Sequence, residues 1–423
     1  MRGQSLLPAA TAVVAIAGAL LWSRAKDHES ATIAARSSAL RRAATSFAAG
    51  AASASASSLV LRRPPTTSPV IALHNLDAEI AEREKHLHAG TPSPPGELIG
   101  RYLVRAKFVG LVSDLVAADD RSAADVAAHP GDAKAHLARA SALGSIHRFA
   151  DALGELDRAQ DHGAPKEEVV RARAGLLLAT GRIDDAASLE PAPAHAQGAP
   201  IEDLVLRGGI DAQRGEPAES ERLFELARDH YRDVSPFTVA WMDFERSRAL
   251  EVAGEGAKAR VYLAEAVAVV PSYTHAVVHL ASTEPPERAM ALLDGLSRSD
   301  DPDVLAARAD ALRRGGRDDE SRAEAAKAKA RFEEVLARLP LAFADHAASF
   351  YLGVGRDPAR ALVLAKANAR NRPTAEALEL WLSAAQAADA RDEACAASRT
   401  IVALPHAPAG FRQRAEVATR GCP

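Results

Sequence analysis

The chain has 423 residues, a formal net charge of −4 and only two cysteines. Hydrophobic residues make up 48% of it and aromatic residues only 4%, so its apolar content is mostly Ala, Leu and Val. This composition suits helices and is poor in strand-forming residue types, which predicts an all-α protein. The acidic balance argues against nucleic acid as a general partner.

The first 26 residues differ from the rest of the chain. An uncharged run of about eighteen residues extends from Ser5 to Trp22, at the short end for a membrane-spanning helix. It is either an uncleaved membrane anchor or an export signal with a small-residue site at 17–19. We expect attachment to the membrane of the cell envelope with the body on the exported, periplasmic side, or secretion if the segment is cleaved. The basic residues after the run would place the body in the cytoplasm instead, by the positive-inside rule.

Residues 27–70 form a basic linker rich in Ala, Ser and Pro. Residues 1–70 carry eight Lys or Arg against two Asp or Glu, a net charge of +6 that leaves −10 for residues 71–423. Such a segment suits anionic lipid head groups, although it is equally suited to being a solvated linker. Residues 71–96 then predict an amphipathic helix followed by a Pro-rich turn.

A helix–turn–helix pattern recurs between residues 97 and 404. The stretch 236–271 shows it best, with an apolar-periodic helix, a turn at Gly254 and Gly256, a second helix and a stop at Pro271. A small residue near the start of each second helix recurs every ~34.6 residues on average, close to the period of tetratricopeptide arrays. These residues are Ala152, Ala186, Ser220, Ala259, Ala289, Ser321, Ala361 and Ala394.

The period and the turn glycines at 181, 215, 254 and 316 resemble the tetratricopeptide repeat family. Prolines 217, 286 and 358 depart from the family pattern, but the first turn of a helix tolerates proline. The resemblance implies a right-handed α-solenoid of about eight to nine degenerate repeats over residues 97–404, with a capping helix in residues 405–423. It also implies a concave groove that binds a peptide or a partner protein.

Set positions on each first helix line that groove if the family pattern transfers. They fall on Trp241, Phe244, Arg248, Glu251, Asp303, Asp310, Arg313, Arg314, Phe343, His346 and Phe350. Aromatic and Arg side chains are the types that dominate binding hot spots. The alternative is that Trp241 and Phe244 simply pack the array.

No stretch of the sequence carries recognisable catalytic chemistry. His275 and His279 have the spacing of metal ligands on a helix, but no third ligand is evident, so we interpret them as surface or groove histidines. The sequence therefore predicts no cofactor, no metal and no enzyme, but a protein-interaction scaffold. The alternative is a regulatory or accessory subunit of an envelope enzyme complex, or an enzyme with an unrecognised site.

Cys395 and Cys422 lie in the last repeat and after the capping helix. A short Pro-rich turn joins these two helices, so they should run antiparallel and bring the cysteines to similar heights. A disulfide between them fits an oxidising compartment, and two free thiols fit a reducing one.

Overall fold

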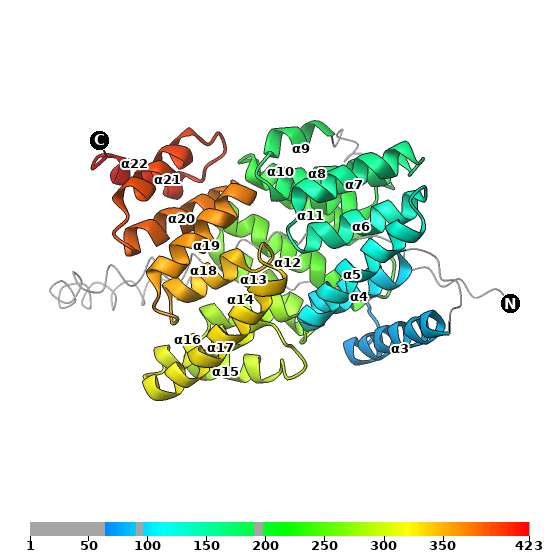
Figure 1. Ribbon diagram of the computed structural model, residues 1–423, viewed down its shortest axis with the longest axis horizontal. Coiled ribbons are helices and arrows are strands. Elements are labelled where there is room, and N and C mark those ends of the chain that lie inside the picture. The colour runs from blue at the N-terminus through cyan, green and yellow to red at the C-terminus, as the bar shows by residue number, and fades with distance from the viewer. Residues whose placement is uncertain (1–63, 90–95, 190–197, 423) are drawn as a thin grey trace, which may run out of the picture.

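The computed structural model describes residues 64–89, 96–189 and 198–422, and these fold into helices and their connections (Figure 1). The all-α class is therefore confirmed. In chain order the helices are α3 (Pro69–His88), α4 (Glu97–Val109), α5 (Val112–Ala128), α6 (Ala133–Ser145), α7 (Phe149–Asp161), α8 (Lys166–Ala179), α9 (Ile183–Leu189), α10 (Ile201–Gln213), α11 (Pro217–His230), α12 (Pro236–Val252), α13 (Gly256–Val269), α14 (Thr274–Thr283), α15 (Pro286–Asp294), α16 (Pro302–Arg314), α17 (Asp318–Arg338), α18 (Ala344–Leu352), α19 (Pro358–Asn371), α20 (Ala375–Ala387), α21 (Arg391–Ala403) and α22 (Ala409–Thr419).

The expected membrane segment, residues 1–26, lies outside the described residues. Within the described ranges, none of the helices combines the length and the apolar character that crossing a bilayer requires.

The helices from α4 to α21 form nine consecutive antiparallel pairs, an α-solenoid of helix–turn–helix repeats, within the described part of the chain. Seven of the eight small residues predicted at the pair interfaces are buried, and the eighth, Ala394, is half-buried. A small side chain there lets the two helices of a pair approach closely. The predicted prolines 217, 286 and 358 each begin a helix.

The turn inside most of the pairs repeats one backbone geometry. Gly254 has a φ of 77°, its N–H donates to the carbonyl of Glu251, and the N–H of Glu255 donates to the carbonyl of Leu250. This is the Schellman end of a helix, which favours glycine because the left-handed conformation strains other residues. The same position, five residues before the small residue, has positive φ at Gly181, Gly215 and Gly316, and also at His147, Arg356 and Asp389.

Successive turns of the solenoid touch one another. The N-terminal repeats contact C-terminal repeats 189 to 224 residues further along the chain, about six repeats at this period. The Oγ of Ser299 donates to the carbonyl of Gly110, and the Nδ2 of Asn371 donates to the carbonyl of His147. The Nε2 of His406 lies within hydrogen-bond distance of the carboxylate of Asp184, at 3.0 Å. The described chain is thus a closely wound superhelix, with one turn lying against the next.

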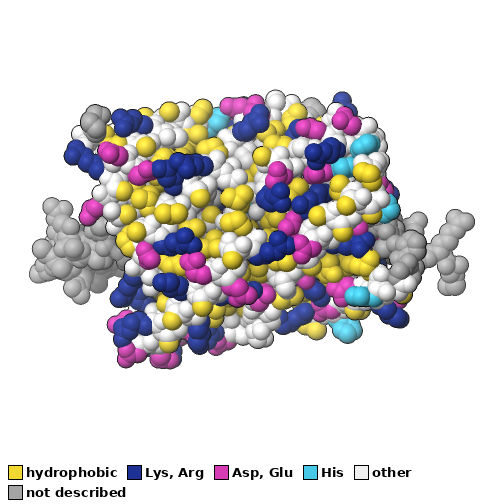
Figure 2. All heavy atoms as spheres, viewed as in Figure 1, with side chains coloured by type: hydrophobic (Ala, Val, Ile, Leu, Met, Phe, Trp, Pro, Cys, Tyr) yellow, Lys and Arg dark blue, Asp and Glu magenta, His cyan; other side chains and the backbone are white. Residues whose placement is uncertain are grey.

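Both large hydrophobic clusters cross this boundary between turns. One joins Phe108 of α4 to Tyr273, with ring centroids 4.6 Å apart, and the other joins Phe149 of α7 to Phe332 of α17. On the outer surface, basic and acidic side chains are interspersed over the face in Figure 2, with apolar side chains between them. The core therefore lies between helices of a pair and between turns.

Candidate functional site

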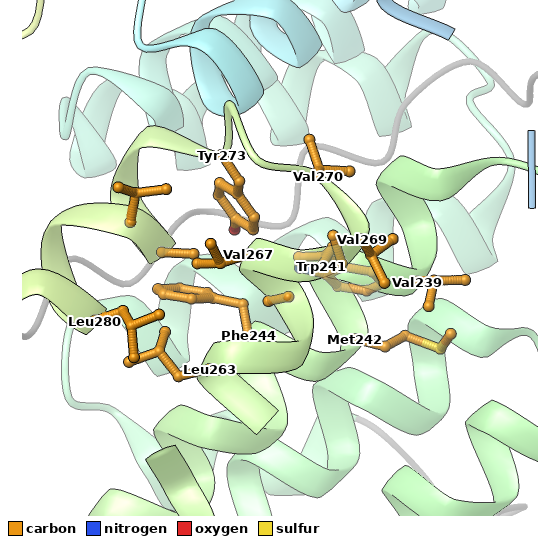
Figure 3. Packing of buried hydrophobic residues seen from close by; sticks show 14 of the residues in the cluster. Val239, Trp241, Met242, Phe244, Leu263, Val267, Val269, Val270, Tyr273 and Leu280 are labelled. Carbon is orange, nitrogen blue, oxygen red and sulfur yellow. The ribbon is translucent and has the colours of Figure 1, made fainter. Parts of the chain in front are cut away.

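The four aromatic side chains predicted for the groove are buried in the hydrophobic clusters. Trp241, Phe244, Phe343 and Phe350 are between 3% and 5% exposed. Figure 3 shows Trp241 and Phe244 among Leu263, Val267 and Tyr273. The structure thus places these aromatics in the packing of the array, which is the alternative that the sequence left open.

Helix α4 from the neighbouring turn covers this part of the inner face. The ring of Phe108 lies 4.8 Å from that of Phe237, and Nζ of Lys107 lies 5.5 Å from the centre of the Trp241 ring. The indole N–H of Trp241 donates to Glu245 at 3.0 Å. Burial lowers the pKa of Lys107 to about 8, although the charge of Glu245 opposes this shift. Aromatic surface that an open groove would expose is therefore occupied by the chain itself.

The predicted charged residues pair mostly within their own helices. Arg248 donates to Glu251 at 2.7 Å, and Arg313 and Arg314 each donate to Asp310 at 2.9 Å. Arg314 also donates to two carbonyls, at residues 281 and 284, at the end of α14. Arg314 therefore ties two consecutive repeats together, and the other charged side chains remain at the inner surface, partly exposed.

Three consecutive repeats bring six polar side chains together around a small cavity. We call them the inner cluster: Thr274, His275 and His279 of α14, Asp301 and Asp303 at the start of α16, and His346 of α18. The cavity offers about 10 Å³ to the centre of a water-sized sphere, room for about one water molecule. Of these residues, Asp303 and His346 belong to the predicted groove set.

Local structure fixes the orientation of these side chains. His275 and His279 are one helical turn apart, so their rings share a face, with centroids 5.2 Å apart. Asp301 is the N-cap of α16 and accepts a hydrogen bond of 2.9 Å from the N–H of Asp303. The Nδ1 of His346 is hydrogen-bonded to Oδ2 of Asp303. His346 and Asp303 thereby link the first helices of two repeats.

The histidines of the inner cluster have opposite protonation behaviour. Burial alone would lower the pKa of His346, but the charges of Asp303, Asp345 and Asp301 raise it to about 10. Burial, together with the nearby charge of His346, lowers the pKa of His275 to about 4. Burial also holds the pKa of His279 well below its usual value. At neutral pH the cluster thus holds one imidazolium and two neutral imidazoles.

The carboxylates complete this arrangement. Burial and the neighbouring charge of Asp303 raise the pKa of Asp301 to about 7. Asp345 lies behind His346 and forms a buried ion pair with Arg372, which caps α19 of the same repeat. Beside them, burial and then the charge of Arg372 lower the pKa of His147 to about 3, so this imidazole is also neutral. The charges are therefore balanced by partners from several repeats.

Two buried carboxylate oxygens of this region have no hydrogen-bond partner among the described residues. They are Oδ1 of Asp303 and Oδ1 of Asp345. No group of three or more His, Cys, Asp or Glu side chains in the described ranges is arranged to hold a metal ion. The site as built is a set of hydrogen-bond acceptors around a water-sized space.

Sequence reasoning found some of this site and missed the rest. It noted the spacing of His275 and His279, and it placed Asp303 and His346 at groove positions. The dipeptide Asp301–Pro302 signals a helix start, yet nothing in it indicates that the carboxylate faces histidines from other repeats. Asp345, Arg372 and His147 gave no signal at all, because their relation depends on how the turns are wound.

Cys395 and Cys422 form a disulfide in the structure, with their Cα atoms 5.7 Å apart. Helices α21 and α22 pack against each other, and the guanidinium of Arg391 donates to the carbonyl of Gly421 beside the bridge. The bridge therefore fastens the last helix of the chain to the last repeat.

Comparison with known proteins yields structural likeness alone. No protein-family model and no curated protein matches this chain. Among solved structures, it is similar to the APC/C hetero-tetramer Cut9-Hcn1 at 12% identity and a TM-score of 0.42, over 75% of this chain and 62% of that one, less than two thirds of its length. It is also similar to the P58(IPK) TPR domain, at 17% identity and a TM-score of 0.21 over 76% and 97% of the two chains. A third is yeast Tom70, at 13% identity and a TM-score of 0.31 over 83% and 96%. At these scores the likenesses carry no argument about function.

Proposed function

We propose that this chain is a non-catalytic protein-interaction scaffold that binds a protein or peptide partner on the inner face of its solenoid. The observation that carries the proposal is the inner cluster. Three consecutive repeats contribute polar side chains from their first helices to the lining of one cavity. That cavity is about the size of a water molecule. Helical-repeat arrays use such a surface, built from equivalent positions of neighbouring repeats, to hold extended partners.

The partner contacts lie at α14, α16 and α18. Helix α4 already covers Trp241 of α12, so that part of the inner face is occupied. Helix α16, which contributes Asp303 to the inner cluster, also carries Asp310 and Arg313, and both of these side chains are partly exposed. We therefore assign recognition mainly to polar and charged groups, in place of the aromatic groove that the family resemblance implies.

The protonation states favour binding over acid–base catalysis. A general acid or base works best when its pKa lies near the operating pH. The three carboxylates around His346 keep this imidazole protonated at neutral pH, with a pKa of about 10, and burial keeps His275 neutral, with a pKa of about 4. Neither imidazole exchanges a proton readily near pH 7. Asp301 does have a pKa of about 7, but its carboxylate accepts the N–H of Asp303 as the N-cap of α16, which is a structural role.

The scaffold acts at the cell envelope in this proposal. Its support is the uncharged run from Ser5 to Trp22 together with the Cys395–Cys422 disulfide, because disulfides persist in oxidising compartments. Fractionation of the native host without detergent tests it. The full-length protein should sediment with membranes, and a chain that begins at Ile71 should not; recovery of both in the soluble fraction would contradict membrane attachment.

Site-specific photo-crosslinking in the native host tests the scaffold function. A crosslinking amino acid at Arg313, on the inner side of α16, should capture a discrete partner protein. The matched control is Val363 of α19, which is 61% exposed. Equal labelling from both positions, or no product from Arg313, would contradict a partner on the inner face.

A further inference from the structure

The inner cluster holds an unpaired acceptor deep in the fold. Asp303 is only 5% exposed, and its Oδ1 lacks a hydrogen-bond partner among the described residues although the side chain lines the cavity. The other oxygen of this carboxylate is engaged by His346. Because a buried polar atom without a partner is costly, a donor brought into the cavity would recover that free energy.

Two neutral imidazoles add acceptors to the same cavity. Burial keeps His275 and His279 uncharged, so each ring has one nitrogen with a free lone pair. Within the described part of the chain, these rings contact Phe244 and each other, and no side chain there donates a hydrogen bond to them. The ring of His275 also contacts that of His346, with centroids 5.4 Å apart. Each ring also keeps one N–H, so among the described residues the acceptors without a partner at the cavity are Oδ1 of Asp303 and one nitrogen of each imidazole.

The imidazolium of His346 adds no hydrogen-bond acceptor to the cavity. Its Nδ1 is bonded to Asp303, and its Nε2 lies 3.9 Å from Oδ1 of Asp345, on the side of the Asp345–Arg372 ion pair. One of its N–H groups is thus bonded to a carboxylate, and the other nitrogen is within ion-pair distance of a second carboxylate but beyond hydrogen-bond distance. Because neither nitrogen is free as a ligand, a divalent metal would have to displace a proton and an ion pair, and a cationic hydrogen-bond donor would not.

We propose that the inner cluster binds the ammonium group of a lysine side chain or of an amino terminus presented by the partner. An ammonium group has three N–H donors and no acceptor, which complements Asp303 and the two neutral imidazoles. A cavity of about 10 Å³ admits one group of this size. The proposal rests on the scaffold function and names the chemistry that the partner brings to it.

Ligand titration of the full chain with ¹⁵N-labelled histidine tests the proposal without any partner. Three probes are compared by the side-chain nitrogen signals of His275 and His279: N-acetyl-lysine amide, glycinamide and N-acetyl-norleucine amide. We expect saturable shifts with the lysine probe if a side chain is the natural ligand, and with glycinamide if an amino terminus is. Norleucine, which has the same chain length as lysine but no charge, should cause no shift.

Two variants test whether Asp303 supplies the carboxylate that binds the ammonium group. Asp303→Asn should weaken binding of the effective ammonium probe at least about tenfold, because it removes a charge-assisted hydrogen bond. The control Asp319→Asn, at a carboxylate that is 94% exposed at the start of α17, should leave it unchanged. If Asp303→Asn fails to fold, the comparison of the lysine and norleucine probes on the unaltered chain still decides whether the inner cluster binds an ammonium group.

Three results would overturn the ammonium site: no response to either ammonium probe, an equal response to norleucine, or saturation by zinc chloride without any response to ammonium. None of these bears on crosslinking from Arg313. Loss of the ammonium response with a preserved crosslink would remove this inference alone, and loss of the crosslink would remove the scaffold function.

Discussion

The backbone N–H of Asp300 donates a hydrogen bond of 3.1 Å to the carbonyl of Gly110, which ends α4 on the neighbouring turn. Gly110 has a φ of 69°, and a Cβ built on it would lie 2.4 Å from Oγ of Ser299 and 2.8 Å from Cβ of Thr274. A side chain cannot occupy that space without movement of both neighbours. Gly110 is therefore a position at which two turns of the solenoid approach closely.

Replacement of Gly110 by Ala should destabilise the protein more than the same change at a turn glycine inside one repeat. Gly254→Ala meets no atom within 4 Å, so we expect only the conformational cost of positive φ, about 1 kcal/mol. Gly110→Ala adds steric overlap, for a loss on the order of 2–4 kcal/mol. Equilibrium unfolding in urea measures both. Equal losses would show that contact between turns contributes nothing.

Ala259 tests the packing within a repeat. It is 2% exposed between α12 and α13, so Ala259→Leu should cost about 1–3 kcal/mol through overpacking. Ala257, two residues earlier on the same helix, is exposed, and Leu there should change the free energy of unfolding by less than about 0.5 kcal/mol. Similar urea midpoints for the two variants would contradict the assigned interface.

Much of the fold could be predicted from the sequence because its determinants are local. A small residue at the pair interface and a glycine five residues earlier recur with the repeat, and both act within about 35 residues. His147, Arg356 and Asp389 adopt the same left-handed turn without glycine, so the pattern alone missed those three turns. Local rules thus predicted the repeat and its phase.

The winding of the solenoid could not be predicted in that way. Contacts such as Asn371 with His147 join residues 224 apart and depend on small rotations summed over several repeats. This is why Trp241 was placed in a groove, whereas Lys107 of the neighbouring turn lies over its ring. The inner cluster could not be predicted for a similar reason. Its six residues come from three repeats, so their contact depends on how those repeats pack together.

The charge of His346 should make stability depend on pH. The carboxylates of Asp303, Asp345 and Asp301 outweigh burial and raise the pKa of His346 from 6.5 to about 10. A raised pKa means that the folded state binds the proton more tightly, so this stabilisation is complete below pH 6.5 and is lost as the pH rises through 10. At about 1.4 kcal/mol per pKa unit, the loss is on the order of a few kcal/mol.

A comparison with His346→Gln isolates this effect. Other groups also titrate between pH 6.5 and 10, notably Lys107, whose pKa burial lowers to about 8. Contributions of groups that do not interact with His346 cancel in the difference between the two proteins, whereas Asp301, with a pKa of about 7, interacts with His346 and belongs to the measured effect. The excess free energy of unfolding of the natural chain over His346→Gln should therefore shrink as the pH rises from 6.5 to 10. A constant difference would mean that His346 is neutral in the folded protein.

The disulfide should be present in protein purified from its own host. Thiol titration after denaturation without reductant should find no free thiol. Cys422→Ser should cost about 3 kcal/mol, because the bridge closes a loop of 27 residues. Reduced natural protein and Cys422→Ser should then unfold at the same urea concentration. Two free thiols would contradict the bridge and remove its support for an exported body.

Contact between turns also determines how the molecule responds to mechanical tension. An open array of helical repeats lengthens like a spring, because each repeat contacts only its neighbours and the pitch can increase a little at every interface. Here an increase in pitch must first separate Gly110 from Asp300 and His147 from Asn371. The solenoid should therefore hold a constant length under low force and extend abruptly once those contacts break.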